Sequence, residues 1–120
     1  MSLHDPNCLF CKIAAGEIPS NQLYSDDKVV AFHDINPEAP LHFLVIPRKH
    51  FENVAALSAD AETSAHLLSV ATTLAEREIT DGYRLVFNTG ANGGQTVFHV
   101  HVHVLGGRGL ADPPGDGHRL

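Results

Sequence analysis

The stretch His99-Val100-His101-Val102-His103-Val104 decides how this chain folds, because histidine and valine alternate strictly along it. Alternation with a period of two predicts a β-strand that directs every histidine to one face and every valine to the other. With a rise of about 3.3 Å per residue, successive histidines lie roughly 6.5–7 Å apart. We expect the valines to pack into the core and to hold the imidazole row in place.

Polar residues often occupy an exposed strand face, and the row can be read in that plain way. Three of the nine histidines on one rigid face fit that reading poorly and favour a metal site or a nucleophile with helpers. All three ligands from one straight strand span roughly 13 Å, which is too far for one ion with bonds of about 2.1 Å. At most two of them share a metal, so nucleophilic and acid–base chemistry explains the row better.

The bulk properties predict a single domain over residues 1–120 with no membrane or nucleic-acid partner. The chain is 43% hydrophobic and 18% charged, as in ordinary globular proteins, and its net charge is −6. An acidic chain lacks the basic face that nucleic acids or anionic membranes need. It has no apolar run of about 18 residues and no signal-peptide pattern at its start, so we expect a cytoplasmic location.

The order of predicted elements indicates an α+β fold with a five-stranded, mostly antiparallel sheet, one long helix and one short helix. The short helix is expected over residues 7–15, with Asp5 or Asn7 as its cap and Gly16 as its end. The long helix is expected over residues 58–80, capped by Ser58. Its core stripe is predicted to contain Leu67, Leu68, Ala71, Leu74, Ala75 and Ile79. The five strands are expected at residues 22–25, 28–34, 42–47, 83–88 and 99–104.

Two further features carry possible chemistry. The loop of residues 88–96 contains Gly93-Gly94 and directly precedes the histidine row, so its backbone is suited to approach an anion. The only two cysteines form Cys8-x-x-Cys11, which indicates a metal or redox site in a cytosolic chain. The plainer alternative is a pair of half-buried thiols on a short helix.

Taken together, the motifs resemble the histidine triad (HIT) family and its nucleotide-binding, Hint-like branch over nearly the whole chain. The resemblance rests on residues 8–13, 16–19, 30–35, 39–50 and 88–108. It implies a HIT-like fold, a homodimer and no organic cofactor. It also implies hydrolysis or transfer at the α-phosphate of a purine nucleotide of the AMP or GMP type, such as a nucleoside 5′-phosphoramidate or an acyl-nucleotide.

The resemblance assigns the catalytic roles to three histidines. His101 attacks phosphorus and forms a nucleotidyl-histidine, which water then resolves. His103 binds the phosphate and protonates or orients the bridging atom, while His42 completes the proton network. The nucleotide-binding positions implied in the same way are Phe32, His33, Asp34, Ile35, Asn88, Gly94, Gln95, Thr96, Val97, His101 and His103. Among them, Asp34 binds the ribose and the 94–97 backbone cradles the phosphate.

His99 has two possible functions. It either supports His101 through a hydrogen bond or acts as a zinc ligand together with Cys8, Cys11 and His50. The latter set is a closed Cys₂His₂ group, typical of a structural zinc site. By resemblance, zinc pins the N-terminal helix to the sheet at a position remote from the nucleophile.

Two departures from the family pattern concern the substrate. Thr96 replaces the usual serine of the phosphate loop and keeps its hydroxyl, whereas Ala111-Asp112 stands where a tryptophan often precedes Pro-Pro-Gly. The leaving-group preference therefore stays open. A dinucleoside polyphosphate hydrolase and a nucleotide-binding interaction protein with incidental turnover are the alternatives, and the span of the row disfavours a histidine-ligated metalloenzyme.

Overall fold

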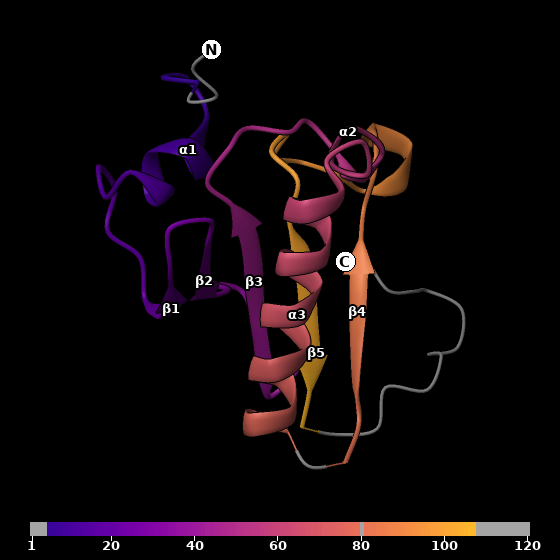
Figure 1. Cartoon of the computed structure of the whole chain (residues 1–120). Helices are drawn as coiled ribbons and strands as arrows, with labels where there is room; N and C mark the ends of the chain where they lie inside the picture. The colour runs from indigo at the N-terminus through magenta and orange to yellow at the C-terminus, as the bar shows by residue number, and fades with distance from the viewer. Residues whose placement is uncertain (1–4, 80, 108–120) are drawn as a thin grey trace.

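Five strands form one antiparallel sheet in the computed structural model, which describes residues 5–79 and 81–107 (Figure 1). The strands are β1 (Gln22–Ser25), β2 (Val29–His33), β3 (Leu41–Pro47), β4 (Tyr83–Phe87) and β5 (Val102–Gly106). Their order across the sheet is β1-β2-β3-β5-β4, and every neighbouring pair is antiparallel. The predicted α+β class and the five-stranded sheet are confirmed.

Three α-helices accompany the sheet: α1 (Leu9–Ala14), α2 (Val54–Leu57) and α3 (Ala61–Glu78). The long helix α3 lies across β3 and β5, whereas α1 lies beyond β3, toward the β1–β2 side (Figure 1). A short 3-10 turn over Ala91–Gly93 stands in the loop between β4 and β5. None of the helices in the described part of the chain is both long and apolar enough to cross a membrane.

The long helix is shorter than predicted, because it begins at Ala61 and the preceding residues Val54–Leu57 form the separate short helix α2. Asn53 caps α2, and Ser58, expected to begin the long helix, instead ends α2. Asp60 is the true cap of α3, since its carboxylate accepts the Thr63 N–H. On α3, Val70 is buried while Leu68 is 42% exposed, so the predicted stripe is wrong at Leu68.

The cap of α1 also differs from the prediction. The Cys8 Sγ accepts the Cys11 N–H at the start of the helix, whereas the Asp5 carboxylate accepts the N–H of Asn7 one turn earlier. The helix is therefore capped by a thiol rather than by Asp5 or Asn7. Gly16, with a φ of +80°, follows the last turn as expected.

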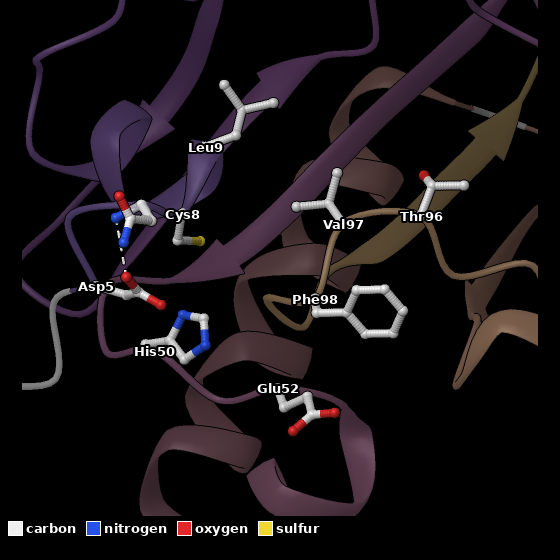
Figure 2. Close-up of a pocket in the computed structure, with 9 residues that line it drawn as sticks. Asp5, Cys8, Leu9, His50, Glu52, Thr96, Val97 and Phe98 are labelled. Carbon is white, nitrogen blue, oxygen red and sulfur yellow. Dashed lines mark hydrogen bonds between the residues drawn. The ribbon is translucent and has the colours of Figure 1, made fainter.

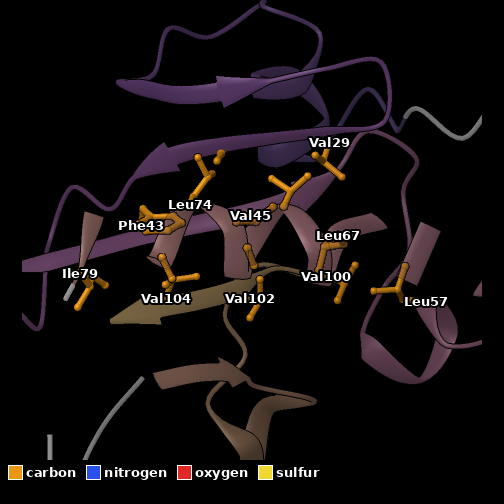
Figure 3. Close-up of a cluster of buried hydrophobic side chains, with 14 residues drawn as sticks. Val29, Phe43, Val45, Leu57, Leu67, Leu74, Ile79, Val100, Val102 and Val104 are labelled. Atoms are coloured by element: carbon orange, nitrogen blue, oxygen red, sulfur yellow. The ribbon is translucent and has the colours of Figure 1, made fainter. Parts of the chain in front are cut away.

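The larger core cluster lies between the sheet and α3 (Figure 3). Val100, Val102 and Val104 all belong to it and are at most 2% exposed, so the valine side of the row packs into the core as predicted. A smaller cluster on the other face joins α1 to β2 and β3. Because both of its faces are covered, β3 is buried along nearly its whole length.

The histidine strand begins later than the sequence pattern predicts. Only Val102–Gly106 pairs with its neighbours, although the side chains of residues 99–101 are buried as well. The partner strand β3 ends at Pro47, which has no N–H to donate. Upstream of Val102 the chain instead bonds to the loop after β3, where the Val100 N–H donates to Phe51 O at 2.7 Å.

Candidate functional site

The three histidines of the row are buried on the face of the sheet that α1 covers. Their exposed fractions are 0% for His99, 7% for His101 and 9% for His103. The rings of His101 and His103 lie edge to face with centroids 5.0 Å apart. An exposed polar strand face does not describe this row.

His99 makes both of the contacts that the sequence left as alternatives. Its Nε2 donates to Pro47 O at 2.8 Å, so its Nδ1 is the unprotonated nitrogen. That Nδ1 lies 3.4 Å from the Sγ atoms of both Cys8 and Cys11. Meanwhile its backbone oxygen accepts the His101 Nδ1–H at 2.8 Å. The ring thus faces the thiols while the carbonyl holds the neighbouring histidine.

Cys8, Cys11, His50 and His99 converge as a candidate metal centre. Their ligand atoms lie within 4.8 Å of one another, and His50 Nδ1 is 3.4 Å from Cys11 Sγ. Tetrahedral zinc, with bonds of about 2.3 Å to sulfur and 2.0 Å to nitrogen, places these atoms roughly 3.5 Å apart. The donor set and its spacing therefore fit zinc, and the Pro47 carbonyl supplies the orienting hydrogen bond that ligating histidines usually make.

The metal cluster is not entirely closed to solvent. Cys8 and His50 line a pocket of about 400 Å³ between α1 and the segment before β5 (Figure 2). Phe98, 44% exposed, and Val97 line the pocket from that segment. Small solutes therefore reach the edge of the cluster from this side.

The expectation that the candidate metal centre is remote from His101 is wrong. His99 O fixes His101 directly, and the Phe10 ring of α1 packs edge-on against both imidazoles. Its centroid lies 6.0 Å from that of His99 and 5.0 Å from that of His101. The Cys/His cluster and His101 are thus linked by the His99 carbonyl on one side and by the Phe10 ring of α1 on the other.

The hydrogen bond to His99 O also fixes the chemistry of His101. A carbonyl oxygen only accepts, so Nδ1 of His101 carries the proton and Nε2 keeps its lone pair. Burial lowers the pKa of His101 below its ordinary value. The ring is therefore neutral at pH 7 and has one free basic nitrogen.

His42 and His103 form a second oriented pair. The Glu38 N–H donates to His42 Nδ1 at 3.0 Å, so His42 carries its proton on Nε2. That Nε2–H donates to His103 Nδ1 at 2.9 Å, which leaves the His103 proton on Nε2. Burial, followed by the neighbouring imidazoles, lowers the pKa of His103 to about 4. His103 is thus a neutral hydrogen-bond donor at its outer nitrogen.

Asp34, His42 and His103 also offer three ligand atoms close together. The hydrogen bonds argue against a metal there. A metal on His42 Nε2 needs a proton on Nδ1, and Nδ1 already accepts the Glu38 N–H. This group is better described as a proton network, in which Asp34 Oδ2 lies 3.5 Å from His42 Nε2.

Two adjoining pockets meet at His101 and His103. One, of about 410 Å³, is largely apolar and runs along α1 and the end of β2; the other, of about 210 Å³, is polar and reaches toward His42 and Gly94. Asp34, Asn36 and Thr96 line both pockets with the two histidines. A ligand with an apolar end and an anionic end suits this combined shape.

The predicted nucleotide-binding residues divide between these pockets. Phe32, His33, Ile35 and Val97 line the apolar pocket, and Gly94 lines the polar one. Ile35 is 91% exposed at the rim, whereas Phe32 is also part of the smaller core cluster. The Ala111–Gly115 segment lies outside the described residues.

Asn88 and Gln95 line neither of these two pockets. The Gln95 side chain accepts the Gly90 N–H and donates to Glu52 O and Val97 O, and its own N–H donates to Gly90 O. The Asn88 amide donates to Gly93 O. Both side chains therefore brace the glycine-rich loop from within, and their predicted contact with a nucleotide stays a prediction.

Sequence reasoning missed the contribution of α1 and the segment after it. Leu9, Phe10 and Ile13 form one wall of the apolar pocket, and Ser20 lies along it with a buried hydroxyl that lacks a partner among the described residues. The sequence signal for Phe10 was an aromatic residue between the two cysteines. That position alone does not distinguish a pocket residue from a core residue.

Comparisons with known proteins agree with this fold. The HIT domain model matches residues 15–110. An uncharacterized HIT-like protein of Synechococcus elongatus is 50% identical over 111 residues, covering 89% of this chain and 96% of the relative. A 14 kDa zinc-binding protein of Zea mays is 46% identical over 117 residues, covering 94% of this chain and 91% of the relative.

Among solved structures, a HIT family hydrolase from Legionella pneumophila superposes with a TM-score of 0.86 at 49% identity. The match covers 91% of this chain and 100% of that one. Together with the matched domain and the buried histidine row, these likenesses show that the chain belongs to the HIT family.

Proposed function

We propose that this protein hydrolyses a purine nucleoside 5′-phosphoramidate or acyl-nucleotide through a covalent nucleotidyl-His101. One observation carries the proposal. The His99 carbonyl fixes His101 and the His42 side chain fixes His103 in complementary tautomers, an acceptor and a donor, where the apolar and polar pockets meet. A nucleophile beside a hydrogen-bond donor suits displacement at phosphorus.

In the first step, His101 Nε2 attacks the α-phosphorus and the bond from phosphorus to the leaving nitrogen or oxygen breaks. The leaving atom accepts a hydrogen bond from the Nε2–H of His103, whose ring His42 orients through Nδ1. A departing amine takes its proton from solvent, and a departing carboxylate needs none. His101 keeps its Nδ1 proton on the His99 carbonyl, so the nucleotidyl ring carries a positive charge. That charge makes the ring a good leaving group for the next step.

In the second step, water attacks the same phosphorus and releases His101. The water proton passes to solvent, and His101 returns to its neutral Nδ1–H tautomer. The products are a nucleoside monophosphate and an amine or ammonia from a phosphoramidate, or a carboxylic acid from an acyl-nucleotide. No redox partner is needed, and water is the only co-reactant.

The two pockets supply the binding groups. The base lies in the apolar pocket beside Phe32, His33 and Ile35, and Asp34 accepts hydrogen bonds from the ribose hydroxyls. The N–H groups of Gly94 and Gln95 are used within the loop. The N–H groups of Thr96 and Val97 therefore bind the phosphate, together with the Thr96 hydroxyl, while Gln95 and Asn88 hold the loop in shape.

We further propose that Cys8, Cys11, His50 and His99 hold a structural zinc ion. Its chemistry is to crosslink α1 to the loop after β3 and to the start of the histidine row. The zinc-binding relative from Zea mays and the ligand spacing support this assignment.

By family resemblance we also propose a cytoplasmic homodimer. We propose that the second copy packs along β4, which lies at one edge of the sheet.

The decisive experiment compares adenosine 5′-phosphoramidate with a diadenosine polyphosphate as substrates for the wild-type protein and for His101→Ala. The matched control is His66→Ala, because His66 bonds to Asp26 from α3 and lines neither pocket. We expect preferred cleavage of the phosphoramidate, loss of at least about 10³-fold in His101→Ala, and near wild-type activity in the control.

Three results bear against the proposal. Cleavage of neither compound, or undiminished activity of His101→Ala, overturns the hydrolase. Preferred cleavage of the polyphosphate transfers the assignment to the alternative substrate class. Rapid quenching should also trap an acid-labile nucleotidyl adduct on His101.

A further inference from the structure

Helix α1 contributes to both the candidate metal centre and the nucleotide pocket. Cys8, at its cap, and Cys11 supply two of the four metal-ligand atoms. Leu9 and Phe10, which lie between the two cysteines, and Ile13 form a wall of the apolar pocket. Whatever fixes this helix therefore sets the shape of the pocket.

A helix of six residues has little stability of its own in water. Among the described contacts, α1 is held by apolar side chains on β2 and β3 and by Arg48, whose guanidinium donates to Ala14 O. The Sγ atoms of Cys8 and Cys11 also lie 3.4 Å from ring nitrogens of His99 and His50, and sulfur makes only weak hydrogen bonds. Metal–thiolate and metal–imidazole bonds are far stronger than such contacts.

The second link runs through His99 to the nucleophile. The His99 ring belongs to the metal cluster, and its carbonyl accepts the His101 Nδ1–H. The Phe10 ring makes T-shaped contacts with both imidazoles, so the helix that carries the thiols also contacts His101. Two independent contacts thus join the metal centre to His101.

We infer that metal binding and nucleotide binding are positively coupled in this protein, with Phe10 as the positioning residue that transmits the coupling. The inference rests on the proposed nucleotide site and zinc centre. Metal fixes α1 and His99 in the arrangement that the nucleotide selects. By linkage, nucleotide must tighten metal binding by the same factor as metal tightens nucleotide binding.

The test measures both halves of that cycle with AMP as the probe. Calorimetry gives the AMP Kd of zinc-loaded and zinc-stripped protein. Equilibrium competition with a chromogenic chelator gives the zinc Kd with and without saturating AMP, and AMP with chelator alone corrects for zinc bound to the nucleotide. The pocket beside Cys8 and His50 gives solutes access to the cluster (Figure 2). We expect both constants to change by the same factor, about tenfold, within the roughly 5- to 150-fold range of such couplings.

Phe10→Ala separates coupling from general stability, because Phe10 supplies no metal-ligand atom. In this variant we expect zinc to bind while its effect on the AMP Kd falls from about tenfold to about threefold, because the link from His99 O to His101 remains. Leu74→Ala is the matched control, since Leu74 is buried in the larger cluster on the other face. It should lower thermal stability and leave the coupling factor unchanged.

The outcomes separate the two proposals. If AMP does not bind the loaded wild-type protein, the nucleotide site fails and the coupling fails with it. If AMP binds equally well to loaded and stripped protein, or does not change the zinc Kd, the coupling alone is overturned. Circular dichroism checks that the stripped protein is folded; where it is not, the zinc titration with AMP decides. Retention of the full factor in Phe10→Ala removes Phe10 from the path.

Discussion

At the scale of single residues, three identical side chains acquire three roles through the backbone groups they meet. Pro47 O accepts a hydrogen bond from the Nε2–H of His99, and His99 O accepts one from the Nδ1–H of His101. His103 Nδ1 instead accepts from the Nε2–H of His42, whose orientation the Glu38 N–H sets. Because each backbone group has a fixed hydrogen-bonding sense, each ring keeps one tautomer.

The His42–His103 pair gives a prediction for pH dependence. The pKa of His103 lies at about 4 and that of His42 below its ordinary value, chiefly because burial disfavours the cation. Since its folded pKa is about 4, the His103 ring stays neutral down to about pH 5. Long-range ¹⁵N–¹H NMR should find the Nε2-protonated form of His103 from pH 8 to about 5, and that of His42 at pH 8. A His103 midpoint near 6.5 contradicts the assignment.

A variant provides the control for that measurement. His42→Ala removes the donor to His103 Nδ1, so His103 is free to exchange between tautomers. We expect its ¹⁵N signals to move toward averaged positions while those of His99, held by Pro47 O, stay unchanged. Unchanged His103 signals indicate that another contact fixes this ring.

At the scale of elements, the sheet and α3 meet without space for a side chain at one point. A Cβ added at Gly106 of β5 lies 2.6 Å from Ile79 Cδ1 and 2.8 Å from its Cγ2. Gly106→Ala therefore forces Ile79 or the end of α3 to move. We expect a loss of about 1–3 kcal/mol in the free energy of unfolding, measured by urea denaturation.

The double mutant tests the cause of that loss. Ile79→Ala alone creates a cavity, whereas in the Gly106→Ala background it removes the clashing atoms. The combined loss should be smaller than the sum of the two single losses by at least about 0.5 kcal/mol. If the two losses in the free energy of unfolding simply add, the clash between the Gly106→Ala methyl group and Ile79 is not the cause of the loss.

The strands could be predicted from local patterns, but several element boundaries could not. Alternating and β-branched residues locate all five strands to within a few positions. The start of β5 depends on Pro47 in another strand, and the start of α3 depends on Asp60 outcompeting Ser58 within a few residues. Helix α2 has only four residues, too few to show a period.

The candidate site could be predicted as a set of residues more completely than as a geometry. Residue chemistry and family resemblance named the three histidines, His42 and the metal ligands. They did not indicate that His99 contributes to both centres or that Gln95 is consumed inside its loop. Both facts depend on where backbone carbonyls lie after folding, which no local pattern encodes.

At the scale of the whole molecule, the two faces of the sheet are stabilised differently. The cluster under α3 contains fourteen buried hydrophobic residues and no metal ligand. The cluster under α1 includes Cys8 and Cys11 and rests on a six-residue helix. The α3 face is therefore held by apolar packing with polar contacts such as His66–Asp26 and Lys28–Glu62 beside it, whereas the other face combines packing with the proposed metal centre.

This asymmetry predicts local unfolding on metal removal. Elemental analysis should first find one zinc per chain. Hydrogen exchange followed by mass spectrometry, before and after chelation, should then show lost protection at residues 8–15, with β3, β5 and α3 still protected. The reason is that α3 and its valine partners do not depend on the four ligands. Cys8→Ser should reproduce the pattern without chelator. Absence of zinc, or equal loss of protection in α3, contradicts a structural zinc centre with this local role.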